Sequence, residues 1–134
     1  MKDRLFDASS LLNVVRTQDS RSIGILNKQY ILDLTVYEVL NAIWKISYRE
    51  KKITQEQSST LVDSILLLMQ RMNVVGIKGL EKRTHELATK EGLTAYDSSY
   101  LTLAEKLDLV LVTDDRELEK AAKKYVKVMK TDDL

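Results

Sequence analysis

The sequence predicts an α/β protein in which helices cover both faces of a mostly parallel sheet. Short apolar runs with strand composition alternate with segments of helical periodicity along the whole chain, and this order is typical of a parallel sheet. The chain has no proline. We also find no repeat, low-complexity tract or linker in it. Its 134 residues fit the size of one domain, so residues 1–134 are expected to form a single domain.

Five segments carry strand signals. The run at 3–6 is apolar at its end, and residues 29–35 have the composition of a strand. Residues 73–79 are typical of a short strand closed by glycine. Residues 108–113 form an apolar run that predicts a buried strand, and 126–131 alternate apolar and polar side chains.

The segments between these strands carry helix signals. A loop and then a short helix are expected within 8–15, and apolar residues recur at helical spacing over 35–46. The capping box Thr54-x-x-Gln57 opens an amphipathic helix that extends to about residue 72. Further helices are expected at 80–91, where Gly92 ends the helix, at 94–107 and at 115–125.

Composition excludes several kinds of site. The chain has no cysteine, so zinc–thiolate sites, thiol nucleophiles and disulfides are excluded. Its single histidine, His85, has no neighbours that suggest a catalytic triad. The net charge of +1 gives no broad basic surface for nucleic acid. The first residues do not resemble a secretory leader and no apolar run is long enough for a bilayer, so we expect a cytoplasmic protein without membrane contact.

Acidic residues follow the strands or begin the helices. Asp7 follows the first apolar run, Glu38 and Asp97 lie in the first turns of expected helices, and Asp114 and Asp115 follow the strand at 108–113. Ligands of open parallel sheets bind beyond the carboxyl ends of the strands. If the sheet is parallel, several of these acids therefore meet at one edge.

Each acid also has a structural explanation. Thr35-x-x-Glu38 and Thr94-x-x-Asp97 match capping boxes, and either acid at 114 and 115 can cap the helix that follows. A capping role is open to Asp7 as well, and Asp33 is a competing acid in a strand-like run. Taken singly, each acid fits a helix cap better than a catalyst. The set as a whole favours a shared site.

Carboxylates that converge in one pocket repel one another. Two like charges about 4 Å apart oppose each other by about 4 kcal/mol at an effective dielectric of 20. A divalent cation relieves this repulsion, and Mg²⁺ or Mn²⁺ prefers oxygen ligands and bridges carboxylates to phosphates. The chemistry matched to such a site is phosphodiester hydrolysis.

Four stretches, in order and over nearly the full length, resemble the PIN-domain ribonucleases, and within them the VapC toxins of type II toxin–antitoxin pairs. They are "LFDASSLLNVV", "DLTVYEVLNAIWK", "LTAYDSSYLTLAEKL" and "LVLVTDDREL". The resemblance implies a three-layer sandwich with about five strands, a Mg²⁺ or Mn²⁺ site and endonuclease cleavage of RNA. It also implies a homodimer and a VapB-like antitoxin that docks over the active site.

The resemblance also assigns roles to residues. It makes Asp7, Glu38, Asp97 and Asp115 the catalytic, metal-binding acids, and it makes Asp114 a variable neighbour. Asp114 is therefore expected to be a helix cap or a bystander. The residues expected to support the acids are Ser9, Asn41 and Thr113.

The RNA contact has to be local, because the chain is almost neutral. Lys78, Lys82 and Arg83 are candidates for it, although solvated helix faces explain most such lysines equally well. Trp44 is expected to pack in the core or a dimer interface. Alternatives to a toxin are a non-catalytic PIN-like binding module, a housekeeping RNA-processing nuclease, and a metal phosphatase or DNA nuclease of similar fold.

Overall fold

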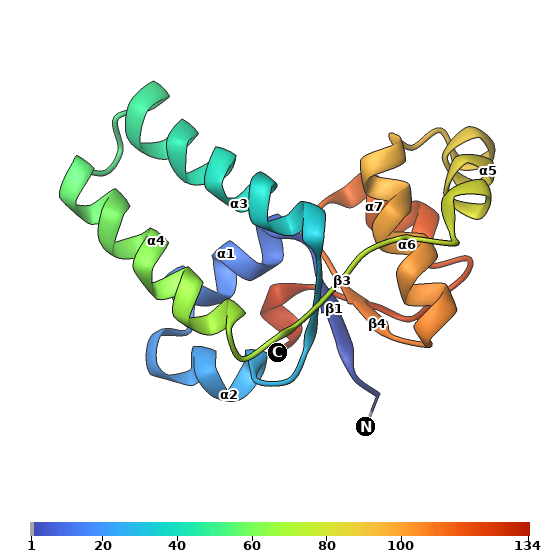
Figure 1. The fold of residues 1–134 in the computed structure, drawn as a ribbon, viewed down its shortest axis with the longest axis horizontal. Helices are drawn as coiled ribbons and strands as arrows, with labels where there is room; N and C mark the ends of the chain where they lie inside the picture. Colours follow the sequence, from blue (N-terminus) through green and yellow to red (C-terminus); the bar gives the residue numbers. More distant parts are fainter. Residues whose placement is uncertain (1) are drawn as a thin grey trace.

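A five-stranded parallel sheet forms the centre of the molecule (Figure 1). The computed structural model describes residues 2–134. The strand order is β3-β2-β1-β4-β5, and every neighbouring pair is parallel. The predicted parallel sheet of about five strands is therefore confirmed. The strands are β1 (Arg4–Phe6), β2 (Tyr30–Leu32), β3 (Asn73–Val75), β4 (Val110–Val112) and β5 (Val128–Met129).

Helices cover both faces of the sheet, which confirms the predicted three-layer sandwich. Figure 1 shows α1 to α4 on one side of the strands and α5 to α7 on the other. The first group is α1 (Ala8–Thr17), α2 (Ser22–Leu26), α3 (Asp33–Trp44) and α4 (Gln55–Met69). The second is α5 (Glu81–Glu91), α6 (Ala95–Leu107) and α7 (Arg116–Ala122). Three shorter helical turns are η1 (Asp19–Arg21), η2 (Lys45–Arg49) and η3 (Thr131–Asp133).

Two hydrophobic cores, one on each face, hold the layers together. Successive side chains of a strand point to opposite faces, so each buried strand supplies both cores. The core under α1 to α4 takes Phe6, Ile31 and Val112 from the sheet. The core under α5 to α7 takes Leu5, Leu32 and Leu111.

The start of α3 differs from the prediction. The strand ends at Leu32 and the helix begins at Asp33, inside the expected strand. The hydroxyl of Thr35 accepts a hydrogen bond from the Leu32 amide, 3.1 Å away, so Thr35 caps the helix from its third position. Thr35 is not the residue before the helix, and the predicted box of Thr35 with Glu38 is wrong.

The other helix ends follow local signals more closely. Thr54 and Gln57 form the predicted capping box of α4, and Gly92 ends α5 at φ 68°, in the left-handed region that favours glycine. The expected loop before the first helix is absent from the described chain, because Asp7 accepts the Ser10 amide and starts α1 directly. The helical turns within 19–26 were not predicted.

The chain order places a switch point beside β1. From β1 the chain moves outward through β2 to β3, and it then returns to add β4 on the other side of β1. In open parallel sheets, ligands bind outside the carboxyl ends of the strands at such a switch point. Asp7 follows β1 there, and residues 113–115 follow β4. No helix within residues 2–134 is long and apolar enough to cross a membrane.

Candidate active site: an acidic pocket at the switch point

A pocket of about 340 Å³ opens at the carboxyl edge of the sheet. Four acidic side chains reach it from separate parts of the chain, at the ends of β1 and β4 and on α3 and α6. The structure thus brings the four predicted acids together with Ser9 and Asn41. The lining residues are Asp7, Ala8, Ser9, Glu38, Asn41, Ala42, Lys45, Asp97, Tyr100 and Asp115.

Asp7 is a buried carboxylate held by three donors. Its Oδ1 accepts the Ser9 hydroxyl at 3.0 Å and the Ser10 amide at 2.9 Å, and its Oδ2 accepts the Thr113 hydroxyl. Burial raises the pKa of Asp7, and the hydrogen bonds from Thr113 and Ser10 act in the opposite direction. Asp7 is therefore both the cap of α1 and a fixed wall of the pocket.

The two neighbouring acids after β4 have different surroundings. Asp115 lines the pocket, and its Oδ1 accepts the amides of Glu117 and Leu118, so it caps α7. Asp114 accepts hydrogen bonds from Asn13 at 2.7 Å and from the amide and hydroxyl of Thr131. Asp114 does not line the pocket, as expected of a bystander to the site, but it does not cap α7 either, so the expected helix cap is wrong; instead it ties α1 to the C-terminal segment.

Glu38 is held by a residue that the sequence analysis assigned no role. The Tyr100 hydroxyl donates a hydrogen bond of 2.6 Å to Glu38 Oε1. The same hydroxyl lies 2.8 Å from Oγ1 of Thr35, and Tyr100 is almost completely buried. A spacing signal was present, because Tyr100 lies three residues after Asp97 and therefore on the same helix face.

Asp97 is the least restrained of the four acids. Its amide is capped by the Thr94 hydroxyl at 3.1 Å, but within residues 2–134 its carboxylate accepts no hydrogen bond. The second half of the predicted capping box is therefore missing. Burial and, after it, the negative charges of Asp115 and Glu38 raise the pKa of Asp97 to about 6. The part of this shift that comes from neighbouring charges reflects the acids gathered around one pocket.

The donor set suits a hard divalent cation bound mainly through water. All four acids offer oxygen, as Mg²⁺ and Mn²⁺ prefer. In the described chain, no three acidic or histidine side chains lie close enough to enclose an ion by themselves. Mg²⁺ usually keeps several waters and uses one or two carboxylates. At roughly 30 Å³ per water, a pocket of about 340 Å³ has room for an ion with such a shell.

Lys45 is a second pocket residue that sequence reasoning missed. It follows Glu38 and Asn41 at positions i, i+3 and i+7 of one helical face, and it begins the π-helical turn η2. Among the residues described, no carboxylate lies within 4 Å of its Nζ, so it brings an unpaired positive charge to the rim. π-Helical turns are frequent at functional sites.

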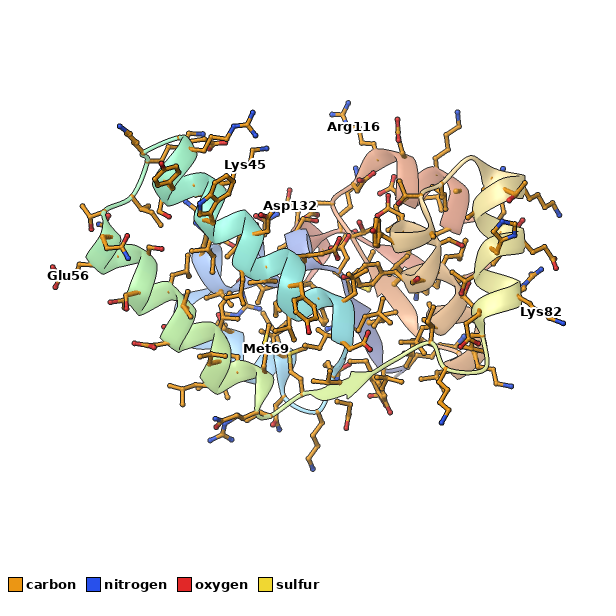
Figure 2. The ribbon with its side chains drawn as sticks, turned by 45° about the horizontal axis from the view of Figure 1, so that its top comes forward. Lys45, Glu56, Met69, Lys82, Arg116 and Asp132 are labelled. Carbon is orange, nitrogen blue, oxygen red and sulfur yellow. The ribbon has the colours of Figure 1, made fainter. Side chains whose placement is uncertain are left out.

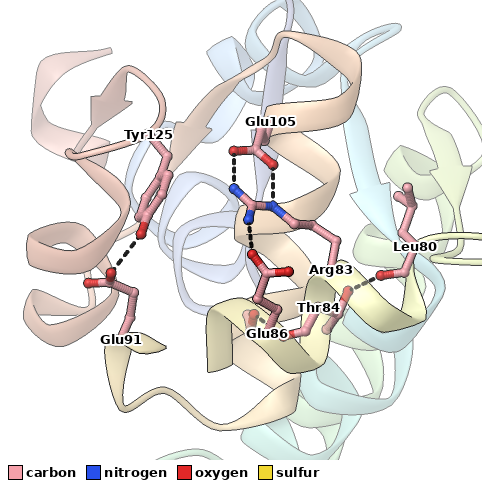
Figure 3. A network of polar contacts seen from close by, with 8 residues as sticks. Leu80, Arg83, Thr84, Glu86, Glu91, Glu105 and Tyr125 are labelled. Carbon is pink, nitrogen blue, oxygen red and sulfur yellow. Dashed lines mark hydrogen bonds and ion pairs between the residues drawn. The ribbon is translucent and has the colours of Figure 1, made fainter. Parts of the chain in front are cut away.

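The predicted RNA contacts lie elsewhere. Figure 2 shows Lys82, in the first turn of α5, across the molecule from Lys45, which belongs to the other helical layer. Lys78 lies in the exposed loop after β3, and neither it nor Lys82 belongs to the pocket lining. The Arg83 guanidinium donates hydrogen bonds of 2.9 and 3.0 Å to the Glu105 carboxylate and a third to Glu86 (Figure 3), so its charge is already paired.

Trp44 does not pack in the core, contrary to one of the two expected placements. Its side chain is 48% exposed and stacks on Tyr48 with ring centroids 5.7 Å apart. Tyr37 and Leu40 are also exposed on the same helix. The outer surface of α3 and η2 therefore carries an aromatic and apolar stripe, defined by Tyr37, Leu40, Trp44 and Tyr48.

Comparisons with known proteins agree with this fold and pocket. The family model described as "PIN domain" matches residues 4–124. Ribonuclease VapC3 of Pyrobaculum aerophilum is 32% identical over 101 residues, which cover 75% of this chain and 76% of the relative. Exonuclease VapC9 of the same organism is 35% identical over 114 residues, which cover 85% and 81%.

A solved structure extends the likeness over the full fold. The crystal structure of PAE2754 from Pyrobaculum aerophilum matches with a TM-score of 0.80 and 32% identity, covering 98% of this chain and 85% of that one. The resemblance inferred from the four acidic stretches is thereby confirmed. By its family match, its relatives and its structure, the chain belongs to the PIN-domain family and is similar to the VapC nucleases within it.

Proposed function

We propose that this chain is a Mg²⁺- or Mn²⁺-dependent endoribonuclease and the toxin of a toxin–antitoxin pair. One observation carries the proposal: four carboxylates from four separate elements line one pocket at the switch point of a parallel sheet. Helix capping does not account for the set, because Glu38 and Asp97 cap nothing with their side chains in the described structure. A shared cation explains their grouping.

The four acids would have different roles in binding the cation. Asp7, Asp97 and Asp115 would hold the cation, directly or through water, and Glu38 would complete the pocket. When bound, the cation stabilises charge on the phosphodiester oxygens and lowers the pKa of water. Ser9 and Thr113 orient Asp7 by donating to its two oxygens. Asn41 lines the pocket one helical turn after Glu38 and offers an amide to the substrate.

Lys45 replaces the earlier candidates as the RNA contact nearest the chemistry. A phosphate entering a pocket of four acids is repelled until cations offset that charge. Lys45 lies at the rim without a partner carboxylate within 4 Å in the described chain, so its ammonium group is free to pair with a phosphate of the bound strand. It would hold the backbone beside the bond that is cut.

A VapB-like antitoxin and a second copy of the chain are the proposed protein partners. The stripe of Tyr37, Leu40, Trp44 and Tyr48 runs along the helix that also supplies Glu38 and Asn41 to the pocket. Clustered exposed apolar side chains mark interaction surfaces in water. A protein docked on this stripe would reach the pocket mouth, which supports an antitoxin that blocks the site.

Circular RNA is the substrate that tests the endonuclease proposal, because an exonuclease needs an end. The purified chain should linearise circular RNA with Mn²⁺ or Mg²⁺ and leave it intact with EDTA. One named relative is an exonuclease. Degradation of linear RNA alone would therefore favour that second activity. RNA binding with no metal-dependent turnover on either substrate would instead favour a non-catalytic module.

A further inference from the structure

A continuous hydrogen-bond relay leads from the backbone of β2 to the pocket. The Leu32 amide donates to Oγ1 of Thr35, that hydroxyl pairs with the Tyr100 hydroxyl at 2.8 Å, and Tyr100 donates to Glu38 Oε1 at 2.6 Å. A phenol has one hydrogen, and here it is given to Glu38, so Thr35 is the donor to Tyr100. Every proton in the relay is therefore assigned, and all point toward Glu38.

The surroundings of the relay make it rigid. Thr35 and Tyr100 are fully buried or nearly so, and the relay connects α3 to α6 across the top of the sheet. Glu38 is only partly buried, and its long side chain has several rotamers when it is unrestrained. Burial and the bond to Glu38 raise the pKa of Tyr100, so the phenol stays a donor at any physiological pH.

We propose that Tyr100, oriented by Thr35, is a positioning residue that fixes Glu38 in the pocket through Oε1 and leaves Oε2 for the cation and the substrate. Within the described residues, no side chain or amide donates to Oε2. The arrangement parallels Asp115, whose Oδ1 is held by two amides. This inference rests on the proposed function of the pocket, and it assigns to Tyr100 a part in that function.

The chain supplies a matched control for the loss of one phenol hydrogen bond. Tyr125 donates to Glu91 Oε2, also at 2.6 Å, at the far end of α5 and away from the pocket (Figure 3). Tyr100→Phe and Tyr125→Phe each remove one hydroxyl from a carboxylate and keep the ring. Only Tyr100→Phe removes it from a pocket residue, so the pair separates positioning from a general loss of stability.

The experiment measures kcat and KM on RNA with saturating Mn²⁺ for wild type, Tyr100→Phe, Tyr125→Phe, Glu38→Gln and the double variant of Tyr100 and Glu38. A hydrogen bond to a charged group accounts for about a 10- to 100-fold change. We expect Tyr100→Phe to lower kcat by that factor with little change in KM, and Tyr125→Phe to match wild type. In the Glu38→Gln background, Tyr100→Phe should cost almost nothing further.

Each outcome decides between the alternatives. A wild-type kcat in Tyr100→Phe overturns the inference. So does a double variant in which Tyr100→Phe lowers kcat by as large a factor in the Glu38→Gln background as it does alone. If Tyr100→Phe does not fold, Thr35→Val tests the same relay, and it should lower kcat in the same direction by a smaller factor. If wild type cuts no RNA, the proposed function fails, and calorimetric titration with Mn²⁺ then decides: equal affinity in wild type and Tyr100→Phe overturns the inference.

Discussion

Thr113 donates its hydroxyl hydrogen to Asp7, a residue 106 positions earlier in the chain. The same hydroxyl oxygen accepts the Asp115 amide at 3.1 Å. One buried threonine therefore connects two pocket acids across the switch point between β1 and β4. The pocket owes part of its geometry to this single hydroxyl.

Thr113→Val should damage both stability and activity. The substitution leaves the buried Asp7 carboxylate one donor short and the Asp115 amide without its acceptor, which costs about 1–3 kcal/mol of unfolding free energy. With less hydrogen bonding, the pKa of Asp7 should rise further. We expect at least a tenfold fall in RNA cleavage near pH 6.5, measured beside urea denaturation. Thr113→Ser restores the hydroxyl, and failure of that variant to recover activity would contradict this role.

The neighbouring acids Asp114 and Asp115 should respond in opposite ways to the same substitution. Asp115→Asn keeps a good N-cap for α7 but loses a pocket charge, so it should abolish cleavage with little loss of stability. Asp114→Asn weakens the hydrogen bonds with Asn13 and Thr131 and should cost about 1–2 kcal/mol while cleavage persists. Thermal denaturation and an RNA cleavage assay on both variants would show whether Asp115→Asn loses activity and keeps stability while Asp114→Asn does the reverse. Inactive Asp114→Asn at full stability would reverse the assignment.

The stability given by Asp114 should depend on pH. Burial acts to raise the pKa of Asp114, but hydrogen bonds from Thr131 and Asn13 outweigh it and lower that pKa below its usual value. A carboxyl with a lowered pKa in the folded state stabilises the protein above the unfolded pKa and loses that contribution as pH falls. The gap between wild type and Asp114→Asn should therefore shrink in acid, which denaturation at pH 7 and pH 3 would measure.

The charged Asp97 carboxylate should lower the free energy of unfolding of the metal-free protein at neutral pH. Its pKa of about 6 in the folded state exceeds the ordinary value of 3.8, so the folded state binds its proton more tightly. Stability should then fall as pH rises from 4 to 6. Asp97→Asn should be more stable than wild type at pH 7.5 in EDTA by about 1–2 kcal/mol, after allowance for solvent screening.

Two comparisons check this account of Asp97. The difference between wild type and Asp97→Asn should nearly disappear at pH 3, below the ordinary value of 3.8, where the carboxyl is largely protonated in both the folded and the unfolded state. Saturating Mn²⁺ should raise the melting temperature of wild type more than that of the variant, because a bound cation offsets the burial and the neighbouring charges that disfavour ionised Asp97. A variant that is less stable than wild type at pH 7.5 in EDTA would contradict this account of Asp97.

Lys45→Ala should weaken RNA binding and its dependence on salt. Each phosphate contact on a single strand contributes about 0.7 to the slope of log affinity against log salt, so losing one contact should lower the slope by about that amount. We expect KM for RNA to rise about tenfold, in line with one lost charged contact. Lys82→Ala, in the first turn of α5 and outside the pocket lining, is the control and should behave as wild type. Equal salt slopes in all three proteins would remove Lys45 from the RNA contact.

The sequence predicted those parts of the site that have a local signal. Asp7 and the pair at 114 and 115 could be found because each follows an apolar strand, and the order of strands and helices indicated the edge where they meet; the resemblance alone selected Asp115 from that pair. Asp97 was placed at the start of the predicted helix at 94–107, and the resemblance to PIN-domain ribonucleases assigned it to the site. The parallel sheet itself is implied by the alternation of elements, since neighbouring strands are then joined by helices.

The remaining features depend on contacts between distant segments. Tyr100 meets Glu38 only because α3 and α6, on opposite faces of the sheet, converge above its carboxyl edge. Thr35 was misplaced because α3 starts two residues earlier than its apolar periodicity, through a hydroxyl that caps from inside the helix. The structural contacts of Asp114 could not be predicted because its partners, Asn13 and Thr131, lie 101 and 17 residues away in the chain.

Cleavage of circular RNA by wild type and Asp97→Asn, with Mn²⁺ and with EDTA, tests the central claim that the four acids form one cation-dependent nuclease site. Wild type should produce linear RNA only with Mn²⁺, and Asp97→Asn, although folded and more stable without metal, should cut at least a hundredfold more slowly. Cleavage at the wild-type rate by Asp97→Asn, or undiminished cleavage by wild type in EDTA, would contradict the claim.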